Sequence, residues 1–248
     1  MAQERLTFEA ATVRPVDPKA EVSEEVAVRP GGRVIINGFG LKALISLAFR
    51  IPYGQISGGE PWMADTQYRV EAVPPAEWQA KITNLRHSYH GIDDAHLREM
   101  LQSVLIERFH LKYRIETRTG TVYGMKRTGK SLGLRPTEAV SEGPEGEKKT
   151  PVSGDIGYAG GKWVFYATSM PQLATFAGTF IVRAPVTDET DLSGVYNYRQ
   201  SVADEAGGDP IHADSFLSML SEVGLKLEKR QGPVETLVIE SAAKPANQ

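Results

Sequence analysis

The hydrophobic and polar positions of this chain repeat with two different periods, and each change of period predicts a boundary between a strand and a helix. Residues 33–37 are mostly β-branched and apolar and lie between glycines, which is typical of a buried strand. The apolar residues from Leu41 to Phe49 recur at helical spacing, and Pro52 closes the predicted helix. Residues 67–72 alternate with a period of two, which predicts a half-buried strand.

The next stretch predicts a second helix followed by a pair of strands. Residues 94–109 place their apolar side chains on one face, and an aspartate at the start can accept the free N–H groups of the first turn. Strands are then predicted at Leu111–Arg118 and Val122–Arg127. Thr119-Gly120 lies between them and predicts the turn of a hairpin.

A polar stretch divides the chain, and the order of elements then repeats. Residues 138–161 include a segment rich in Glu, Gly, Pro, Ser and Lys, which predicts a flexible linker. After it come a strand at Trp163–Tyr166, a helix capped by Ser169 and a strand at Gly194–Arg199. A further helix leads into a predicted hairpin, whose two strands and turn are Leu225–Arg230, Val234–Glu240 and Gly232-Pro233.

The two halves therefore share one predicted order of strand, helix, strand, helix, strand, strand. Phe109–Lys112 and Val223–Lys226 are the closest local echo, since each passes from a predicted helix into a predicted hairpin. We expect an α+β fold of two pseudo-repeated β-α-β-α-β-β units, with mostly antiparallel sheets, packed as one pseudo-symmetric body because each half alone is small. The predicted units are residues 1–137 and 162–248. The alternative is two independent domains on a flexible tether.

Composition narrows the classes of function. The 248 residues include no cysteine, which excludes disulfides, thiolate nucleophiles and Cys-based zinc sites. No apolar stretch approaches the roughly 20 residues that span a bilayer, so no integral membrane segment is expected. The net charge of -3 gives no support to nucleic-acid binding. The N-terminus has no apolar signal core, so the chain is either cytoplasmic or begins near the mature end of an exported protein.

Blocks of sequence along nearly the whole chain carry a resemblance to a known family. They are Phe8–Pro15, Gly32–Val34 with Leu41–Leu44, Ile56–Trp62, Met100–Lys112 with Glu116–Arg118, and Leu225–Glu240 with Lys244-Pro245. Together they resemble the soil-associated family abundant in acidobacteria that is catalogued as a domain of unknown function.

The resemblance implies a location rather than an activity. Members usually carry secretion signals, which implies a periplasmic or secreted protein, and the domain is sometimes attached to membrane-embedded metallopeptidases of the antibiotic-sensor type. No catalytic residues are established for the family, so none is carried over. This chain has Thr190-Asp-Leu192 where Thr-Gly-Leu is usual, and the family's frequent histidine in the first hairpin falls near Arg114.

One local cluster could support metal chemistry. His87 and His90 are three residues apart and precede Asp93 and Asp94. On a helix, two imidazoles at this spacing share a face and could bind zinc or copper, with a carboxylate as third ligand. No further ligand pair follows at a recognisable distance, so we favour a polar helix start capped by aspartate and predict neither a metal nor another cofactor. These four residues are the first to test for catalysis.

Aromatic residues gather around one glycine turn and are candidate ligand contacts. Tyr53, Trp62 and Tyr68, together with Trp78, surround Gly58-Gly59. Aromatic side chains on a loop can line a ligand cleft. The alternative is that Trp62 closes the end of the hydrophobic core.

The remaining motifs carry less information about function. Residues 108–135 carry many Lys and Arg and one acidic residue, Glu116, with tyrosines between them. Such a segment could contact a polyanion, but it is also typical of the water-facing side of a half-buried hairpin. Neither a nucleophile elbow nor a phosphate-binding glycine loop is present.

Three hypotheses of function follow. The first is a non-catalytic, exported, sensor-like module that binds a small molecule or a protein partner, at the seam between its halves. The second is a hydrolase of unadvertised type, possibly metal-assisted. The third is a protein that recruits a partner by strand addition at an exposed hairpin edge.

Overall fold

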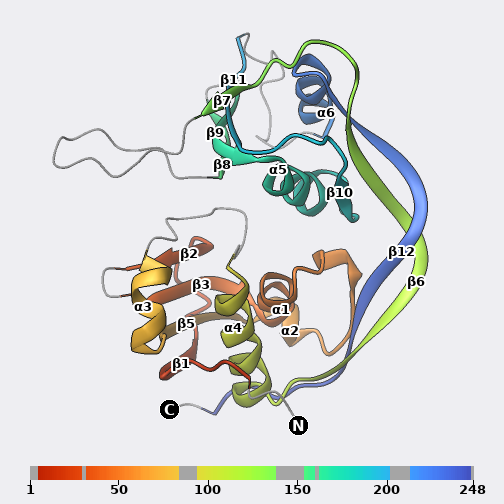
Figure 1. Cartoon of the computed structure of the whole chain (residues 1–248). Helices are drawn as coiled ribbons and strands as arrows, with labels where there is room; N and C mark the ends of the chain where they lie inside the picture. Colours follow the sequence, from red (N-terminus) through yellow and green to blue (C-terminus); the bar gives the residue numbers. More distant parts are fainter. Residues whose placement is uncertain are drawn as a thin grey trace, which may run out of the picture. The chain divides into compact units, whose positions relative to one another are not determined.

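The computed structural model of the chain describes residues 5–29, 32–83, 94–137, 154–159, 162–201 and 213–246. It divides into two compact units, and each has its own sheet and its own hydrophobic core (Figure 1). Unit 1 comprises Met1–Arg118 and Glu235–Gln248, and unit 2 comprises Thr119–Val234. None of the helices in the described ranges is long and apolar enough to cross a bilayer.

Unit 1 is built on a four-stranded antiparallel sheet. In spatial order its strands are β1 (Ala10–Pro15), β5 (Gln67–Val73), β3 (Val34–Gly40) and β2 (Glu25–Val28). Val13, Val70 and Ile36 lie in register across three of these strands, and each is at most 7% exposed. This row is one part of the core face, and the residues between its members along each strand belong to the opposite face.

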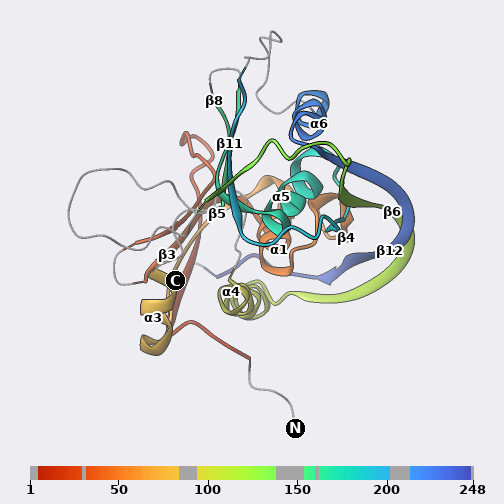
Figure 2. The ribbon, with the colours of Figure 1, turned by 45° about the horizontal axis from the view of Figure 1, so that its top comes forward.

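Helices pack on the core face of this sheet. The remaining elements of unit 1 are α1 (Leu41–Phe49), the 3-10 turn η1 (Tyr53–Gln55), β4 (Ile56–Gly58), α2 (Trp62–Asp65), α3 (Ala76–Thr83) and α4 (Ala95–Arg108). Helices α1 and α4 pack against each other, as Figure 2 shows from another direction. Leu44 and Ile45 of α1 and Leu101 and Leu105 of α4 are fully buried in the same core. The predicted helices at 41–49 and 94–109 are confirmed.

Unit 2 has a second four-stranded antiparallel sheet. Its strands, in spatial order, are β7 (Arg135–Thr137), β11 (Val195–Arg199), β9 (Lys162–Ser169) and β8 (Asp155–Ala159). The other elements are α5 (Met170–Phe176), the π-helical turn η2 (Ala177–Ile181), β10 (Val186–Asp188) and α6 (Ala213–Glu222). Ser169 caps α5 as predicted, in a reciprocal capping box with Gln172. Trp163, Phe176 and Phe216 form the centre of the core, with ring centroids 5.0–5.9 Å apart.

Two long strands correct the predicted hairpins. Residues Lys112–Arg127 form one continuous strand, β6, and Leu225–Ser241 form another, β12. They are neighbours in a third sheet of order β10-β6-β12-β4, and Figure 1 shows them side by side. Neither Thr119-Gly120 nor Gly232-Pro233 reverses the chain.

The physical reason lies in what the two glycines face. A Cβ on Gly120 would lie 3.0 Å from Val234 Cγ2, and a Cβ on Gly232 would lie 2.8 Å from Val122 Cγ2. Each glycine therefore makes room for a valine on the neighbouring strand. A glycine that accommodates a close approach inside a strand has the same sequence signal as one in a turn.

The sheets of the two units share strand order and register. Tyr68 on β5 lies opposite Phe39 and Pro15, and Tyr196 on β11 lies opposite Thr168 and Pro136. Both central strand pairs shift register next to a residue with positive φ, Gly38 in β3 and Ala167 in β9.

In the third sheet, each unit contributes one short strand that pairs in parallel with one of the two long strands. Strand β4 pairs in parallel with residues 237–239 of β12, and β10 pairs in parallel with residues 123–125 of β6. Leu237 and Ile239 of β12 belong to the core of unit 1, whereas Met125 of β6 belongs to the core of unit 2.

The predicted α+β class and the mostly antiparallel sheets are confirmed, but the predicted domain limits differ from the compact units. The first prediction ended at residue 137, whereas unit 1 ends its first segment at Arg118 and regains residues 235–248. The cause is that β6 and β12 are long enough for each to contribute to both units. Residues 155–159 of the predicted flexible linker form β8, paired with β9, and most of the remaining linker lies outside the described residues.

Candidate functional site

Three residues of the predicted metal cluster, His87, His90 and Asp93, lie outside the described residues. The fourth, Asp94, is the N-cap of α4, and its Oδ1 accepts a hydrogen bond of 2.7 Å from the N–H of Leu97. This is the capping role that the sequence favoured for an aspartate here. Among the residues with described structure, no group of three or more His, Asp or Glu side chains could hold a metal ion.

The three aromatic candidates, Tyr53, Trp62 and Tyr68, differ in exposure. Tyr53 lies in η1 and is 49% exposed. Trp62 begins α2 and is partly buried against the core, with Lys244 Nζ 5.7 Å from the centre of its ring. The glycines between them have a steric role, because a Cβ on Gly58 would lie 2.5 Å from Ile239 O and both glycines have positive φ.

Tyr68 belongs to the interior. It is 1% exposed, and its ring meets that of Phe109 edge to face at a centroid distance of 4.9 Å. Its hydroxyl has no hydrogen-bond partner among the described residues, and burial raises the pKa of the phenol. The ring of Trp78 lies against that of His96, with a centroid distance of 4.1 Å.

The buried polar side chains of both units are neutral. Over the described ranges they are Ser103, Thr168, Thr190 and Gln200. Each is used internally: for example, Ser103 Oγ donates to Leu6 O at 2.7 Å, and Gln200 Oε1 accepts from the N–H of Trp163 at 3.1 Å. A buried acid, base or histidine with a displaced pKa is the usual mark of a catalytic site, and the described interiors contain none.

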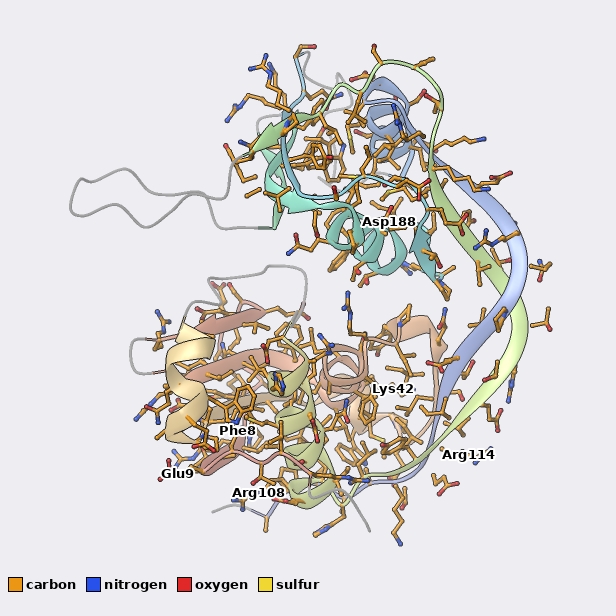
Figure 3. All side chains as sticks on the ribbon, viewed as in Figure 1. Phe8, Glu9, Lys42, Arg108, Arg114 and Asp188 are labelled. Carbon is orange, nitrogen blue, oxygen red and sulfur yellow. The ribbon has the colours of Figure 1, made fainter. Side chains whose placement is uncertain are left out.

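Three basic residues of segment 108–135, Arg114, Arg118 and Lys126, form ion pairs, and two of them pair with acidic residues from other parts of the chain. Arg114, labelled in Figure 3, lies 3.3 Å from Glu240 and also pairs with Glu116. Lys126 Nζ lies 2.6 Å from Glu228. Arg118 and then Arg114 hold the pKa of Glu116 below its usual value, and Lys126 does the same for Glu228. Part of the charge that suggested a polyanion surface is therefore paired within the protein.

The face of the first sheet opposite its core face carries a less balanced group of charges, which we call the arginine face and define as Arg14, Arg33, Arg69 and Glu71. Arg14 on β1 lies directly opposite Arg69 on β5. Arg69 Nε lies 2.7 Å from Glu71 Oε1, and Arg33 Nη1 lies 4.0 Å from Glu71 Oε2. All three arginines are exposed.

The arginine face thus has three guanidinium groups and one carboxylate, that of Glu71. The hydrogen bond from Arg69, with the charges of Arg33 and Arg14, lowers the pKa of Glu71. The formal charge of the arginine face is +2, from three arginines and one glutamate. Arg14 has neither an ion pair nor a side-chain hydrogen bond with any described residue. Sequence reasoning missed this group because the pairing of β1 with β5 joins residues 55 positions apart.

Comparison with known families gives one match. Residues 42–242 match the family described as "Protein of unknown function (DUF3738)". The chain belongs to the DUF3738 family. The predicted resemblance to a family of unknown function is confirmed to that extent. Neither the curated proteins nor the solved structures include a significant match.

The DUF3738 match runs from α1 to the end of β12; it includes unit 2 and the part of unit 1 that follows β3, whereas β1, β2 and β3 precede it. Of the arginine face, Arg69 and Glu71 lie inside the matched residues, and Arg14 and Arg33 precede them. Tyr53, Trp62 and Tyr68 all lie within the matched part of this DUF3738 chain.

Proposed function

We propose that this protein is a non-catalytic, exported binding module that holds an acidic segment of a partner protein on its arginine face. The observation that carries the proposal is the arrangement of three exposed arginines, Arg14, Arg33 and Arg69, around one carboxylate, Glu71, on the sheet face opposite the core face.

The pair of Arg14 and Arg69 favours an anionic partner. Like charges directly opposite each other on neighbouring strands destabilise a sheet by about 0.2–1 kcal/mol. A carboxylate from outside would remove this repulsion. Each guanidinium presents a planar fork of N–H donors that matches a carboxylate in two-point geometry. An acidic peptide segment would therefore gain both charge neutralisation and orientation from this face.

The neutral interiors support a binding role over catalysis. The pKa shifts of Glu71, Glu116, Glu189 and Glu228 all arise from ion pairs with arginine or lysine at the surface. Shifts of this origin stabilise structure or prepare a charged surface, and they do not hold a proton ready for transfer near neutral pH.

Export is part of the proposal. A chain without cysteine can pass an oxidising compartment without thiol mispairing, and the resemblance to a family with secretion signals agrees with this. Fractionation of the native host should recover the protein outside the cytoplasm. Recovery only with cytoplasmic markers would refute this part.

We also infer that the two units descend from a duplicated element. The support is the shared strand order together with the equivalent positions of Tyr68 and Tyr196, each opposite a proline on an edge strand. An alignment of many family members should superpose residues 34–73 on 163–199 in this register. A different register would contradict the duplication.

The test of binding uses poly-L-glutamate as the probe, labelled with a fluorophore and titrated with protein at low ionic strength. The double variant Arg14→Ala/Arg69→Ala should weaken binding at least tenfold. The matched control is Arg127→Ala/Lys226→Ala, which removes the same charge from exposed positions on β6 and β12. Equal loss in both variants, or no binding by the unmodified protein, would overturn the proposal.

A further inference from the structure

The outer edge of β2 is not paired with any other strand in the described part of the chain. Strand β2 is the last strand of its sheet and pairs with β3. The N–H of Arg29 donates to Arg33 O at 2.8 Å, which fixes the phase of the ladder. In an antiparallel pair, residues that bond to the partner strand alternate with residues whose backbone groups point away from it. Since Arg29 bonds to Arg33, immediately before β3, the N–H and C=O groups of Val28 and Val26 point away from β3. No described residue bonds to these outward groups.

The opposite edge strand of the same sheet, β1, has its outward backbone groups partly covered, in contrast to β2. On β1, Arg108 Nη2 donates to Ala11 O at 3.0 Å and so covers an outward carbonyl; Arg108 is labelled in Figure 3. Pro15 ends β1 and has no N–H to offer. Proteins commonly protect edge strands in these ways, and an edge without such protection is a template for another strand.

The sequence of β2 is complementary to itself. In an antiparallel pair centred on Ala27, Val26 of one copy would lie opposite Val28 of the other, and their outward groups would exchange backbone hydrogen bonds. Glu25 of one copy would lie opposite Arg29 of the other. Within one chain, Glu25 and Arg29 already form an ion pair of 3.3 Å. In the dimer, two ion pairs between the copies would replace the two within them, so no charge would be left unpaired.

The side chains on the core face also continue across such a pair. Val26 lies opposite Ile36 and Val28 opposite Val34, and both strand partners are 1% exposed. Val26 and Val28 are only partly buried, at the border of this apolar layer. A second strand beside them would cover the border with two more valines.

We propose that two copies of this chain associate through β2, so that two four-stranded sheets join across a two-fold axis into one sheet of eight strands. The interface is isologous, since the same surface serves both copies. A strand of four residues buries little area, so the dimer belongs to the weak class and should form between about 10 and 100 µM. The proposal concerns the sheet edge and does not depend on anion binding at the arginine face.

Sedimentation velocity of the full chain between 1 and 200 µM tests the proposal. We expect a concentration-dependent shift from monomer to dimer. Glu25→Arg and Arg29→Glu should each weaken the dimer at least fivefold, because each places like charges opposite each other. The double variant Glu25→Arg/Arg29→Glu should restore it, because the charges are exchanged but remain complementary.

A second variant separates edge pairing from folding. Val26→Pro removes an outward N–H that β3 does not use, so the monomer should keep its circular dichroism spectrum and lose the dimer. A monomer at all concentrations, or a dimer unaffected by Val26→Pro, would overturn the proposal. A double charge variant that stays as weak as the single variants would overturn the predicted register. Arg14→Ala/Arg69→Ala should dimerise normally, which distinguishes this result from a failure of the arginine face.

Discussion

Two tyrosines at matching places in the two sheets differ in the partner of their hydroxyl group. Tyr196 donates to Ser193 O at 2.9 Å, whereas the Tyr68 hydroxyl is buried without a described partner. Burying an unbonded hydroxyl costs about 1–3 kcal/mol, while an ordinary hydrogen bond contributes about 0.5–1.5 kcal/mol. Tyr68→Phe should therefore leave the free energy of unfolding unchanged or raise it, and Tyr196→Phe should lower it. Denaturant titrations of both variants measure the two signs, and a large loss for Tyr68→Phe would contradict the unbonded hydroxyl.

A third tyrosine makes stability depend on pH in the alkaline range. Burial, followed by the charge of Glu222 and the hydrogen bond to it, raises the pKa of Tyr198 to about 12. Because the folded value lies above the unfolded value near 10, the stabilisation is present below pH 10 and is lost as the pH rises toward 12. Tyr198→Phe should flatten the decline of unfolding free energy over this interval. A slope equal to that of the unmodified protein would contradict the shift.

The histidine pair outside the described residues can be tested directly. We expect the purified chain to hold no stoichiometric zinc or copper, and the double variant His87→Ala/His90→Ala to have the same metal content. Inductively coupled plasma mass spectrometry measures both. Stoichiometric metal that disappears in the variant would instead favour the hydrolase hypothesis.

At the scale of elements, the continuity of β6 and β12 has a direct test by cross-linking. Lys126 and Glu228 are joined by an ion pair across the two strands, in the same register that places Gly120 opposite Val234. Residues directly opposite in an antiparallel pair have Cα atoms about 4.5–5.5 Å apart, within the range of a disulfide. Lys126→Cys/Glu228→Cys should oxidise to a cross-linked species, and the chain has no other cysteine to compete.

The matched control tests the hairpin that the sequence predicted. A turn at Thr119-Gly120 would place Tyr113 opposite Lys126, whereas on one extended strand these residues are far apart. Tyr113→Cys/Lys126→Cys should therefore remain reduced under the same oxidant. Efficient oxidation of this control would contradict the continuous strand.

These strands also mark the limit of what the sequence could predict. Local patterns identified α1, α4 and α5 because their apolar spacing and caps lie within a few residues of each other. The same patterns could not separate a glycine in a turn from one facing a valine, because Val234 and Val122 come from distant segments. The arginine face was missed for the same reason, and Tyr68 could not be assigned to the core until its strand had neighbours on both sides.

At the scale of the whole molecule, the two shared strands couple the folding of both units. Leu44 and Leu173 occupy matching places in α1 and α5, and both are fully buried. Replacing either with alanine should lower the free energy of unfolding by about 2–5 kcal/mol. We expect each variant to shift one common transition, because losing either unit leaves half of β6 and half of β12 without their sheet. Differential scanning calorimetry measures this, and two separate transitions would show that the units unfold independently.

The division of unit 1 between the two ends of the chain affects how a nascent polypeptide can fold. Residues 235–248 leave the ribosome after all of unit 2, yet Leu237 and Ile239 belong to the same core as α1 and α4, which are made far earlier. Domains usually fold in the order of their synthesis. Here the core of unit 1 stays incomplete until residues 235–248 have been made, which is after all of unit 2. Until these residues are made, unit 1 is incompletely folded, and an incompletely folded chain can still pass through a translocation pore.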